Sequence, residues 1–264
     1  MEQKTVVYSG TTIAYRTTGK GLPVLLLHGF GEDSRVLEQQ ENVLRSSYQL
    51  IIPDIPGSGQ SALLHKESLT INDLAECIKC IIDRENVSKL ALIGHSMGGY
   101  ISLAFAEKYP SALTALGLFH SSAYADDAAK IETRQKGIAF IKNNGALAFL
   151  KTSIPGLFAD TIKSGPIIDD LLQKAADFTP EALIQYYEAM IARPDRTAVL
   201  KTLPCPVLFI AGAFDKAVPF EHSLEQFSLP LYADVNILRD SAHMGMLEEK
   251  DRSNAILAAF LQKL

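Results

Sequence analysis

The pentapeptide Gly94-His95-Ser96-Met97-Gly98 constrains the fold of this chain more than any other feature. It follows the apolar run 90–93, which has the composition of a buried strand, and it precedes a helical stretch that begins near Gly99. A sharp turn from strand to helix exposes the serine hydroxyl at the end of a sheet, and glycines beside it avoid collisions with neighbouring backbone. The sequence therefore predicts that Ser96 is a nucleophile in an α/β protein.

A serine hydroxyl is a weak nucleophile at neutral pH, so this prediction requires a histidine base and an acid that orients it. The best base is His243, because it follows the strand-like run 235–238 and precedes a helical pattern. The best acid is Asp215, because the apolar run 207–211 ends in Gly-x-x-Asp at a strand's carboxyl end, where open parallel sheets bind ligands. The alternatives for the acid are Asp126, Asp127 and Asp240.

Two further segments carry recognisable loop motifs. Residues 25–31 are Leu-Leu-Leu-His-Gly-Phe-Gly, and residues 54–61 are Asp-Ile-Pro-Gly-Ser-Gly-Gln-Ser. Together with the order Ser96, Asp215, His243, they make the chain resemble the α/β-hydrolases, whose triad has that order and whose loops have the patterns His-Gly and Asp-x-x-Gly-x-Gly-x-Ser. Four motifs in the expected order are far more specific than any one of them.

The resemblance implies the chemistry of the serine esterase-like branch of that family, which is that of a carboxylesterase-like hydrolase. In this branch the backbone N–H groups of the residue after His-Gly and of the residue after the nucleophile form the oxyanion hole; here these are Phe30 and Met97. Ser96 attacks an ester carbonyl while His243 takes its proton, Asp215 holds the imidazole, and water hydrolyses the acyl-enzyme. The resemblance implies no metal and no organic cofactor.

Strand and helix patterns alternate along most of the chain, as in a mostly parallel sheet of about eight strands flanked by helices. The expected strands are 6–8, 12–15, 23–27, 49–53, 88–93, 113–119, 206–211 and 234–238, and the expected helices between them are 34–46, 70–85, 98–109, 220–227 and 247–262. The pattern is helical throughout residues 121–202. We therefore expect an α/β-hydrolase core of residues 1–120 and 203–264, with residues 121–202 inserted as a helical cap, or lid, over the site.

The substrate pocket is expected at the carboxyl edge of the sheet, beneath this insertion. The residues expected to bind substrate are His95, His120, Phe140, Phe158 and Tyr186. The alternative for the aromatic residues is a small core within the insertion, and the alternative for His95 is a role in shaping the turn. Because the insertion is rich in apolar side chains and has no constellation of charges, the wall facing Ser96 is expected to be mainly hydrophobic and the substrate small and largely apolar.

Composition excludes several other classes of function. The net charge of −5 and the lack of a Lys/Arg cluster argue against a nucleic-acid partner, and no apolar run approaches the roughly 20 residues of a membrane span. The three cysteines form no obvious disulfide framework, which favours the cytoplasm, and Cys77 and Cys80 fall in a helical pattern where we expect them to pack. We expect a cytoplasmic monomer or homodimer that acts on a small molecule.

Two other functions stay open on these motifs. A carbon–carbon bond hydrolase or lyase of the same fold uses the same serine site. A hydrolase-fold small-molecule sensor combines an intact triad with a lid that recruits a protein partner. Product identification distinguishes the first from an esterase, and a turnover measurement distinguishes the second.

Overall fold

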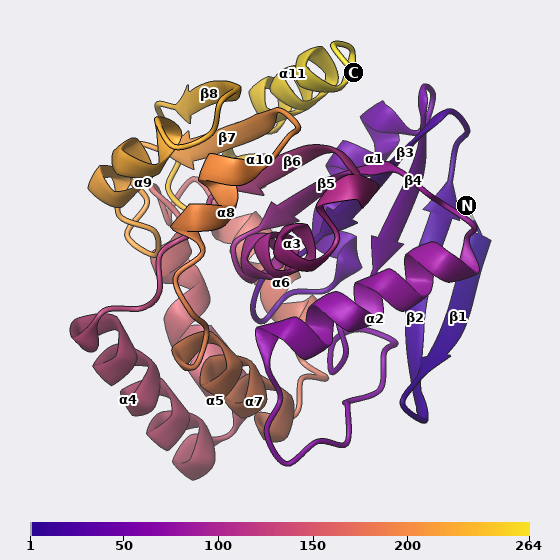
Figure 1. Ribbon diagram of the computed structural model, residues 1–264. Helices are drawn as coiled ribbons and strands as arrows, with labels where there is room; N and C mark the ends of the chain where they lie inside the picture. The colour runs from indigo at the N-terminus through magenta and orange to yellow at the C-terminus, as the bar shows by residue number, and fades with distance from the viewer. Residues whose placement is uncertain (1) are drawn as a thin grey trace.

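The computed structural model describes residues 2–264, which fold around one twisted sheet (Figure 1). The sheet has eight strands in the order β1-β2-β4-β3-β5-β6-β7-β8. Its first pairs, β1 with β2 and β2 with β4, are antiparallel, and all later neighbours are parallel. The strand bounds are Glu2–Tyr8 (β1), Thr11–Thr18 (β2), Leu22–Leu27 (β3), Tyr48–Pro53 (β4), Leu90–His95 (β5), Leu113–Phe119 (β6), Val207–Gly212 (β7) and Ala233–Leu238 (β8). The prediction of a mostly parallel eight-stranded α/β fold is confirmed.

The central strands are buried on both faces, whereas β1 at the sheet edge is largely exposed. Every residue of β5 and of β7 is buried, which explains their continuous apolar sequences, since a parallel strand covered on both faces has no polar side. In β1 exposed residues alternate with half-buried ones. Because β5, β6 and β7 are neighbouring parallel strands, their carboxyl ends lie at the same edge of the sheet.

Helices cover the sheet, and α2 and α3 lie in front of it in Figure 1. The helix α2 begins at a capping box, in which Thr70 and Asp73 satisfy each other's backbone N–H groups, and it buries an apolar face that includes Cys77. The bounds of these helices are Glu38–Leu44 (α1), Ile71–Arg84 (α2), Met97–Lys108 (α3), Phe220–Phe227 (α9), Gly245–Glu248 (α10) and Lys250–Leu261 (α11). None of the helices within residues 2–264 combines the length and the apolar character required to cross a bilayer.

Between β6 and β7 the chain runs through helices and turns, and the helices α4, α5 and α7 of this segment lie at the lower left of Figure 1. The helices α4 and α7 pack against each other, and α5 contacts both α4 and α6. Their bounds are Ala128–Asn144 (α4), Ala146–Ser153 (α5), Gly165–Lys174 (α6), Pro180–Ile191 (α7) and Thr197–Thr202 (α8). This helical segment leaves the sheet at the carboxyl end of β6, next to the end of β5.

Candidate active site

Ser96 occupies the turn between β5 and α3 with a strained backbone. Its φ of 51° and ψ of −116° are unusual for a residue other than glycine, and such conformations cost on the order of 1–3 kcal/mol. The turn also brings backbone segments very close together, because a Cβ on Gly98 would lie 2.6 Å from the carbonyl oxygen of His28, and a Cβ on Gly94 would collide with the backbone of Gly98. This sharp turn directs the Ser96 side chain away from the sheet.

His243 links Ser96 to Asp215 through a continuous chain of hydrogen bonds. The Nε2 atom of His243 lies 2.9 Å from Ser96 Oγ, and its Nδ1 atom lies 2.8 Å from Asp215 Oδ2. An ionised carboxylate only accepts, so Nδ1–H donates to Asp215 and Nε2 is free to accept the serine proton. The structure therefore brings together the three residues that the sequence assigned to one site, although they are up to 147 positions apart in the chain.

Asp215 is held in place as an ionised carboxylate. Its Oδ1 atom accepts hydrogen bonds from the backbone N–H groups of Ala217 (2.8 Å) and Val218 (2.9 Å). Burial by itself raises the pKa of this carboxyl, but the interactions with the two neighbouring histidines, His243 and His120, together outweigh burial and hold the pKa well below its usual range. The carboxylate is consequently charged throughout the neutral and mildly acidic range, and it stabilises the imidazolium that forms when His243 takes a proton.

His120 packs behind Asp215 as a neutral imidazole. Its Nδ1 atom accepts a hydrogen bond from Gly212 N–H (3.2 Å) and lies 3.3 Å from Asp215 Oδ2. Accepting at Nδ1 places the ring proton on Nε2, an atom that is buried and has no hydrogen-bond partner within the described part of the chain. Burial lowers the pKa of His120 to about 4. His120 thus supports the acid loop and does not face the cavity beside Ser96.

Replacing His120 with asparagine is expected to flatten the dependence of stability on pH. Folding lowers the His120 pKa from 6.5 to about 4, so its contribution to stability is present above pH 6.5 and is lost as the pH falls toward 4. By linkage the loss is roughly 3 kcal/mol over that interval. Asparagine tolerates the left-handed backbone at this position, where φ is 48°.

Urea unfolding of wild type and His120→Asn at pH 7, 5.5 and 4 measures this effect. Comparing pH values within each protein cancels any general loss of stability. The exposed His65 provides the control, and His65→Asn should keep the wild-type slope. An equal slope in wild type and His120→Asn would show that His120 is not buried as a neutral group.

His95 connects the loop of Glu32 with the loop of His243. Its Nδ1 atom lies 3.1 Å from Glu32 Oε2 and its Nε2 atom 3.0 Å from the carbonyl oxygen of His243, while Glu32 Oε2 also accepts from Gly29 N–H at 2.7 Å. Burial disfavours both charges, but their mutual attraction outweighs it, so the pKa of His95 is raised and that of Glu32 is lowered. A buried ion pair thereby fixes both loops relative to Ser96.

Ser96 and His243 open into a cavity of about 140 Å³. Its other walls come from residues of the His-Gly loop, of α3, of the helices after β6, and of the acid loop: Phe30, Glu32, Tyr100, Lys130, Thr133, Arg134, Leu150, Ser153, Ile154, Leu157, Tyr187, Met190, Ala217 and Val218. An engineered cavity of about 150 Å³ holds benzene, so this one accommodates a group of about six heavy atoms. Neither the Phe30 nor the Met97 backbone N–H donates to another group among residues 2–264.

The five residues expected to bind substrate are placed away from this cavity's lining. His95 and His120 are buried behind the site, as described above. Tyr186 is fully buried and donates to the Pro56 carbonyl at 2.6 Å, and Phe158 is buried among the helices. Phe140 is 38% exposed and packs on Phe149. The spacing of these five side chains in the sequence does not distinguish such positions from pocket lining.

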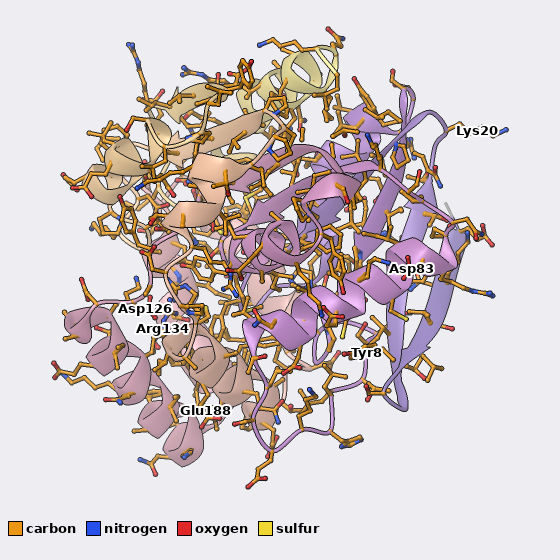
Figure 2. The ribbon with its side chains drawn as sticks, viewed as in Figure 1. Tyr8, Lys20, Asp83, Asp126, Arg134 and Glu188 are labelled. Carbon is orange, nitrogen blue, oxygen red and sulfur yellow. The ribbon has the colours of Figure 1, made fainter. Side chains whose placement is uncertain are left out.

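Most residues that line the cavity are apolar, in line with the expected hydrophobic wall. The expectation that the insertion brings no charges to this wall is wrong, because Lys130 and Arg134 both line the cavity. They lie four residues apart on α4 and therefore share one face of that helix. Figure 2 shows Arg134 beside Asp126, and its Nε atom lies 2.5 Å from Asp126 Oδ2. In the sequence, the i, i+4 spacing of Lys130 and Arg134 is the only feature that places both side chains on one helix face. Charged residues with this spacing more commonly lie on a solvent-exposed face, so the sequence alone does not indicate that they line the cavity.

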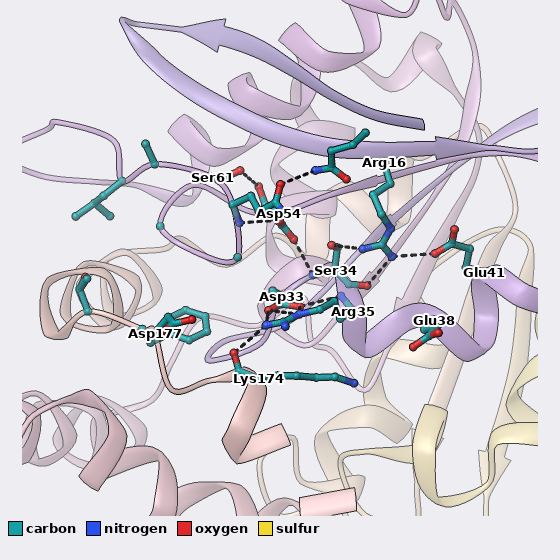
Figure 3. A pocket seen from close by; sticks show the side chains of 18 residues that line it. Arg16, Asp33, Ser34, Arg35, Glu38, Glu41, Asp54, Ser61, Lys174 and Asp177 are labelled. Atoms are coloured by element: carbon teal, nitrogen blue, oxygen red, sulfur yellow. Dashed lines mark hydrogen bonds and ion pairs between the residues drawn. The ribbon is translucent and has the colours of Figure 1, made fainter. Parts of the chain in front are cut away.

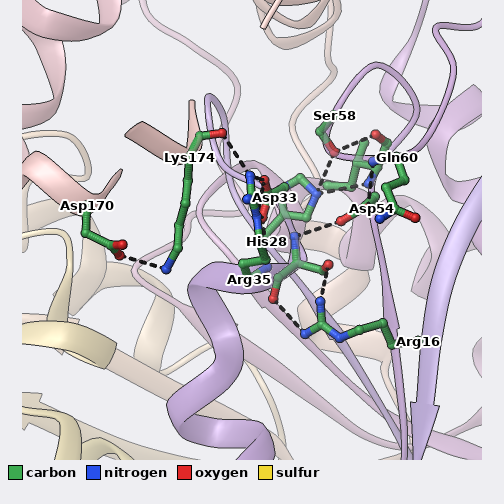
Figure 4. A network of polar contacts seen from close by, with 11 residues as sticks. Arg16, His28, Asp33, Arg35, Asp54, Ser58, Gln60, Asp170 and Lys174 are labelled. Atoms are coloured by element: carbon green, nitrogen blue, oxygen red, sulfur yellow. Dashed lines mark hydrogen bonds and ion pairs between the residues drawn. The ribbon is translucent and has the colours of Figure 1, made fainter. Parts of the chain in front are cut away.

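A larger hollow of about 790 Å³ lies elsewhere, and it shares no lining residue with the Ser96 cavity (Figure 3). Four of its charged side chains form two ion pairs, Arg16 with Glu41 at 2.9 Å and Arg35 with Asp33 at 2.5 Å. In the same region His28 accepts from Ile55 N–H at 2.9 Å, which ties the His-Gly loop to the loop after β4 (Figure 4). These contacts shape loops and offer no nucleophile.

Within the described part of the chain, one group of residues has atoms close enough to hold a metal ion: His120, Asp215 and His243, whose ligand atoms lie within 4.8 Å of one another. In the present arrangement, however, His243 Nδ1 and Asp215 share a hydrogen bond and His120 Nδ1 accepts from Gly212. The same atoms are thus fully engaged in orienting the imidazole. The chemistry of this set is that of a proton-transfer site.

Comparisons with known proteins identify the family. Residues 23–136 match a family model described as the alpha/beta hydrolase fold. The structure of a thermophilic esterase from Thermogutta terrifontis, solved with malate bound, has a TM-score of 0.92 and 28% sequence identity, and the match covers 100% of this chain and 99% of the esterase.

Two curated relatives match over most of this chain. The 3-oxoadipate enol-lactonase 1 of Acinetobacter baylyi is 24% identical over 97% of this chain and 95% of the lactonase. A dihydrolipoyllysine-residue acetyltransferase component of the acetoin cleaving system from Pseudomonas putida is 30% identical over 92% of this chain, which spans 64% of that relative's length. The sheet topology, the family match and these relatives agree with the resemblance carried by the sequence motifs. The chain is therefore an enzyme of the α/β-hydrolase superfamily.

Proposed function

We propose that this enzyme is a serine hydrolase that cleaves a small ester-type substrate, either a carboxylic ester or a lactone, through an acyl-enzyme intermediate. The observation that carries the proposal is the unbroken hydrogen-bond chain from Ser96 Oγ through His243 to Asp215, with links of 2.9 and 2.8 Å, at the floor of a small cavity. A nucleophile, its base and an orienting acid within hydrogen-bond reach are what covalent acyl transfer requires.

In the first half-reaction Ser96 Oγ forms a bond to the substrate's carbonyl carbon as its proton moves to His243 Nε2. The Phe30 and Met97 N–H groups stabilise the oxyanion, a role supported by their lack of other acceptors among the described residues. The intermediate collapses, the bond from the carbonyl carbon to the alcohol oxygen breaks, and the alcohol leaves with the proton from Nε2. Asp215 keeps the imidazole in the tautomer with its proton on Nδ1, which leaves Nε2 free for these proton transfers.

In the second half-reaction water replaces the alcohol. His243 Nε2 takes a proton from water as the hydroxide oxygen bonds to the acyl carbon, and the same proton returns to Ser96 Oγ when the acid leaves. The net change is the addition of one water across the ester bond. In a lactone the acid and the alcohol remain parts of one product.

Residues 121–202 act in this proposal as a cap that encloses the substrate. Support comes from the cavity walls, since Lys130, Leu150, Tyr187 and Met190 come from this segment and Ser96 from the core. The volume of about 140 Å³ favours a small acyl or alkyl group. The relatives support the same reaction class, as they include an esterase and an enol-lactonase. The proposed setting is the cytoplasm, which three unpaired cysteines favour, and the proposed active form is a monomer or homodimer.

A panel of small substrates tests the proposal against its alternatives. Esters, lactones, thioesters and vinylogous diketones are incubated with the enzyme, and products are identified by mass spectrometry. We expect repeated turnover of an ester or lactone with release of acid and alcohol groups. Cleavage confined to the diketones would instead establish a carbon–carbon hydrolase. A single turnover with retained product would favour a sensor that recruits a protein partner.

A further inference from the structure

Lys130 is placed at a position where a cation is costly. It lies in the first turn of α4, where the helix dipole is positive, and its ammonium is largely buried. Burial and the neighbouring charge of Arg134 lower its pKa, and the weaker opposing effects of the Asp126 and Asp215 carboxylates do not reverse this shift. Burial, the positive end of the helix and the Arg134 charge all disfavour the charged form of Lys130. A group in such an environment, inside the cavity that holds a nucleophile, is a candidate for a functional role.

Among the described residues, Lys130 has no carboxylate at ion-pair distance. Its Nζ atom donates to the carbonyl oxygen of Ala217 at 2.6 Å, and no carboxylate within residues 2–264 forms an ion pair with it. An ammonium has three donors, so two remain for other acceptors. Because Ala217 lies two residues after Asp215, this bond holds the Lys130 head group at the acid side of the cavity.

Arg134 adds a second positive charge to the same wall. Its partner Asp126 is shared with Arg193, whose Nη1 atom lies 2.8 Å from Asp126 Oδ1. One carboxylate thus faces two guanidinium groups, and with Lys130 the group of four residues has an excess of two positive charges. The only acid in the cavity lining, Glu32, is neutralised by His95.

Two cavity-lining tyrosines supply neutral donors beside these cations. Arg134 lies 5.5 Å from the ring centre of Tyr187, and Arg193 lies 3.9 Å from that of Tyr100. Neither the Tyr100 nor the Tyr187 hydroxyl has a hydrogen-bond partner among the residues that the structure describes. The cavity wall therefore offers both charged and neutral hydrogen-bond donors.

We propose that Lys130, assisted by Arg134, selects substrates that carry a carboxylate close to the scissile ester. This inference rests on the serine-hydrolase function proposed above and names its substrate class. The small cavity requires that the carboxylate be within a few carbons of the ester carbonyl or of the ester oxygen. Binding the anion supplies Lys130 with the ion-pair partner that the described residues do not.

Two isosteric pairs of esters test this proposal. Monomethyl glutarate is compared with methyl 5-methylhexanoate, which places the carboxylate or an isopropyl group on the acyl side. O-acetylglycolate is compared with isobutyl acetate, which does the same on the alcohol side. Initial rates of acid release are measured in a pH-stat at neutral pH and constant ionic strength. We expect kcat/KM to favour the carboxylate by about 10- to 100-fold in at least one pair, the range of a charge-assisted hydrogen bond.

The variant Lys130→Met should remove this preference, bringing the ratio of the two kcat/KM values close to one. Lys136→Met is the matched control, because Lys136 lies on the same helix with a side chain that is 75% exposed. It should keep the wild-type ratio. If the hydrogen bond to Ala217 serves only to hold α4 against the core, Lys130→Met will lower kcat/KM for both esters of a pair by the same factor. The ratio of the two values will then stay unchanged.

Binding to the inactive Ser96→Ala protein gives a readout that needs no turnover. Calorimetry with the preferred carboxylate ester should show weaker binding by a similar factor when Lys130→Met is added. Equal turnover of both members of each pair, or a preference that survives Lys130→Met, would overturn the substrate class while leaving the hydrolase intact. Carboxylate binding that depends on Lys130, without turnover of any of the four esters, would instead reject the ester-hydrolase function.

Discussion

Replacing Ser96 with alanine is expected to lower kcat for ester hydrolysis by about 10⁶-fold, the loss found when a serine protease loses its nucleophile. The hydroxyl is the only group at this position that can form the covalent bond, and the proposed Phe30 and Met97 donors leave only a small residual rate. The fold should survive, because alanine and serine experience the same backbone strain at a φ of 51°. Steady-state kinetics and thermal unfolding measure the two effects separately.

The matched control is Ser153, whose side chain lines the same cavity. Ser153 has no histidine partner, since its hydroxyl faces the Leu150 carbonyl. We expect Ser153→Ala to keep kcat within about tenfold of wild type, because the substitution alters the pocket lining and leaves the Ser96–His243–Asp215 chain intact. Comparable losses in the two variants would mean that the cavity, and not a unique nucleophile, governs the rate.

Replacing Asp215 with asparagine is expected to lower kcat by about 10⁴-fold, as the equivalent change does in a serine protease. The amide removes the negative charge that faces His243 Nδ1–H at 2.8 Å and favours the wrong imidazole tautomer. The amide also loses acceptors for the N–H groups of Ala217 and Val218, so some loss of stability should accompany the loss of rate. Activity is measured below the unfolding temperature of the variant.

Asp240 provides the control for this prediction, because the sequence left it open as an alternative acid. Its side chain is exposed, and the ring of His243 is already engaged by Asp215. We expect Asp240→Asn to change kcat by less than about threefold, as surface substitutions usually have small effects. A much larger loss in Asp240→Asn than in Asp215→Asn would reassign the acid.

The sequence predicted the sheet well because its central strands are buried on both faces. The expected strand 113–119 coincides with β6, and the expected strand 206–211 is displaced by one residue from β7. An apolar run of six or seven residues between turn residues is too short for a typical helix and is therefore best explained as a buried strand. The strand order follows from parallel pairing and short connections. The sharp turn at Ser96 could be predicted from its flanking glycines, because a Cβ at either position would collide with nearby backbone.

Helix boundaries were less predictable, because hydrogen bonds to distant residues interrupt helical patterns. The expected helix 247–262 is divided into α10 and α11 at Glu249, whose φ is −119°. The Glu249 carboxylate accepts from the backbone N–H of Asp240 and the hydroxyl of Ser241, and thereby ties the start of α11 to the loop before His243. Apolar periodicity contains no information about such a contact.

The pocket was the least predictable part, since it depends on how α4, α5 and α7 pack over the sheet. Aromatic side chains such as Tyr186 have the same helical spacing whether they face a pocket or a core. Lys130 and Arg134 face inward only because Asp126 and Ala217 hold them there. Interactions over 8 and 87 positions in the chain decide these orientations, and local patterns do not encode them.

The most direct test of the proposed mechanism is covalent labelling with a small organophosphonate ester that transfers its phosphonyl group to an activated serine. Intact-mass measurement and peptide mapping should find one adduct on wild type, on the peptide that contains Ser96, with activity lost in proportion to labelling. His243→Ala should react far more slowly, because its serine has no base, and Ser96→Ala should not react. An equal adduct on Ser96→Ala, or full activity after complete labelling of Ser96, would contradict the assignment of this serine as the nucleophile.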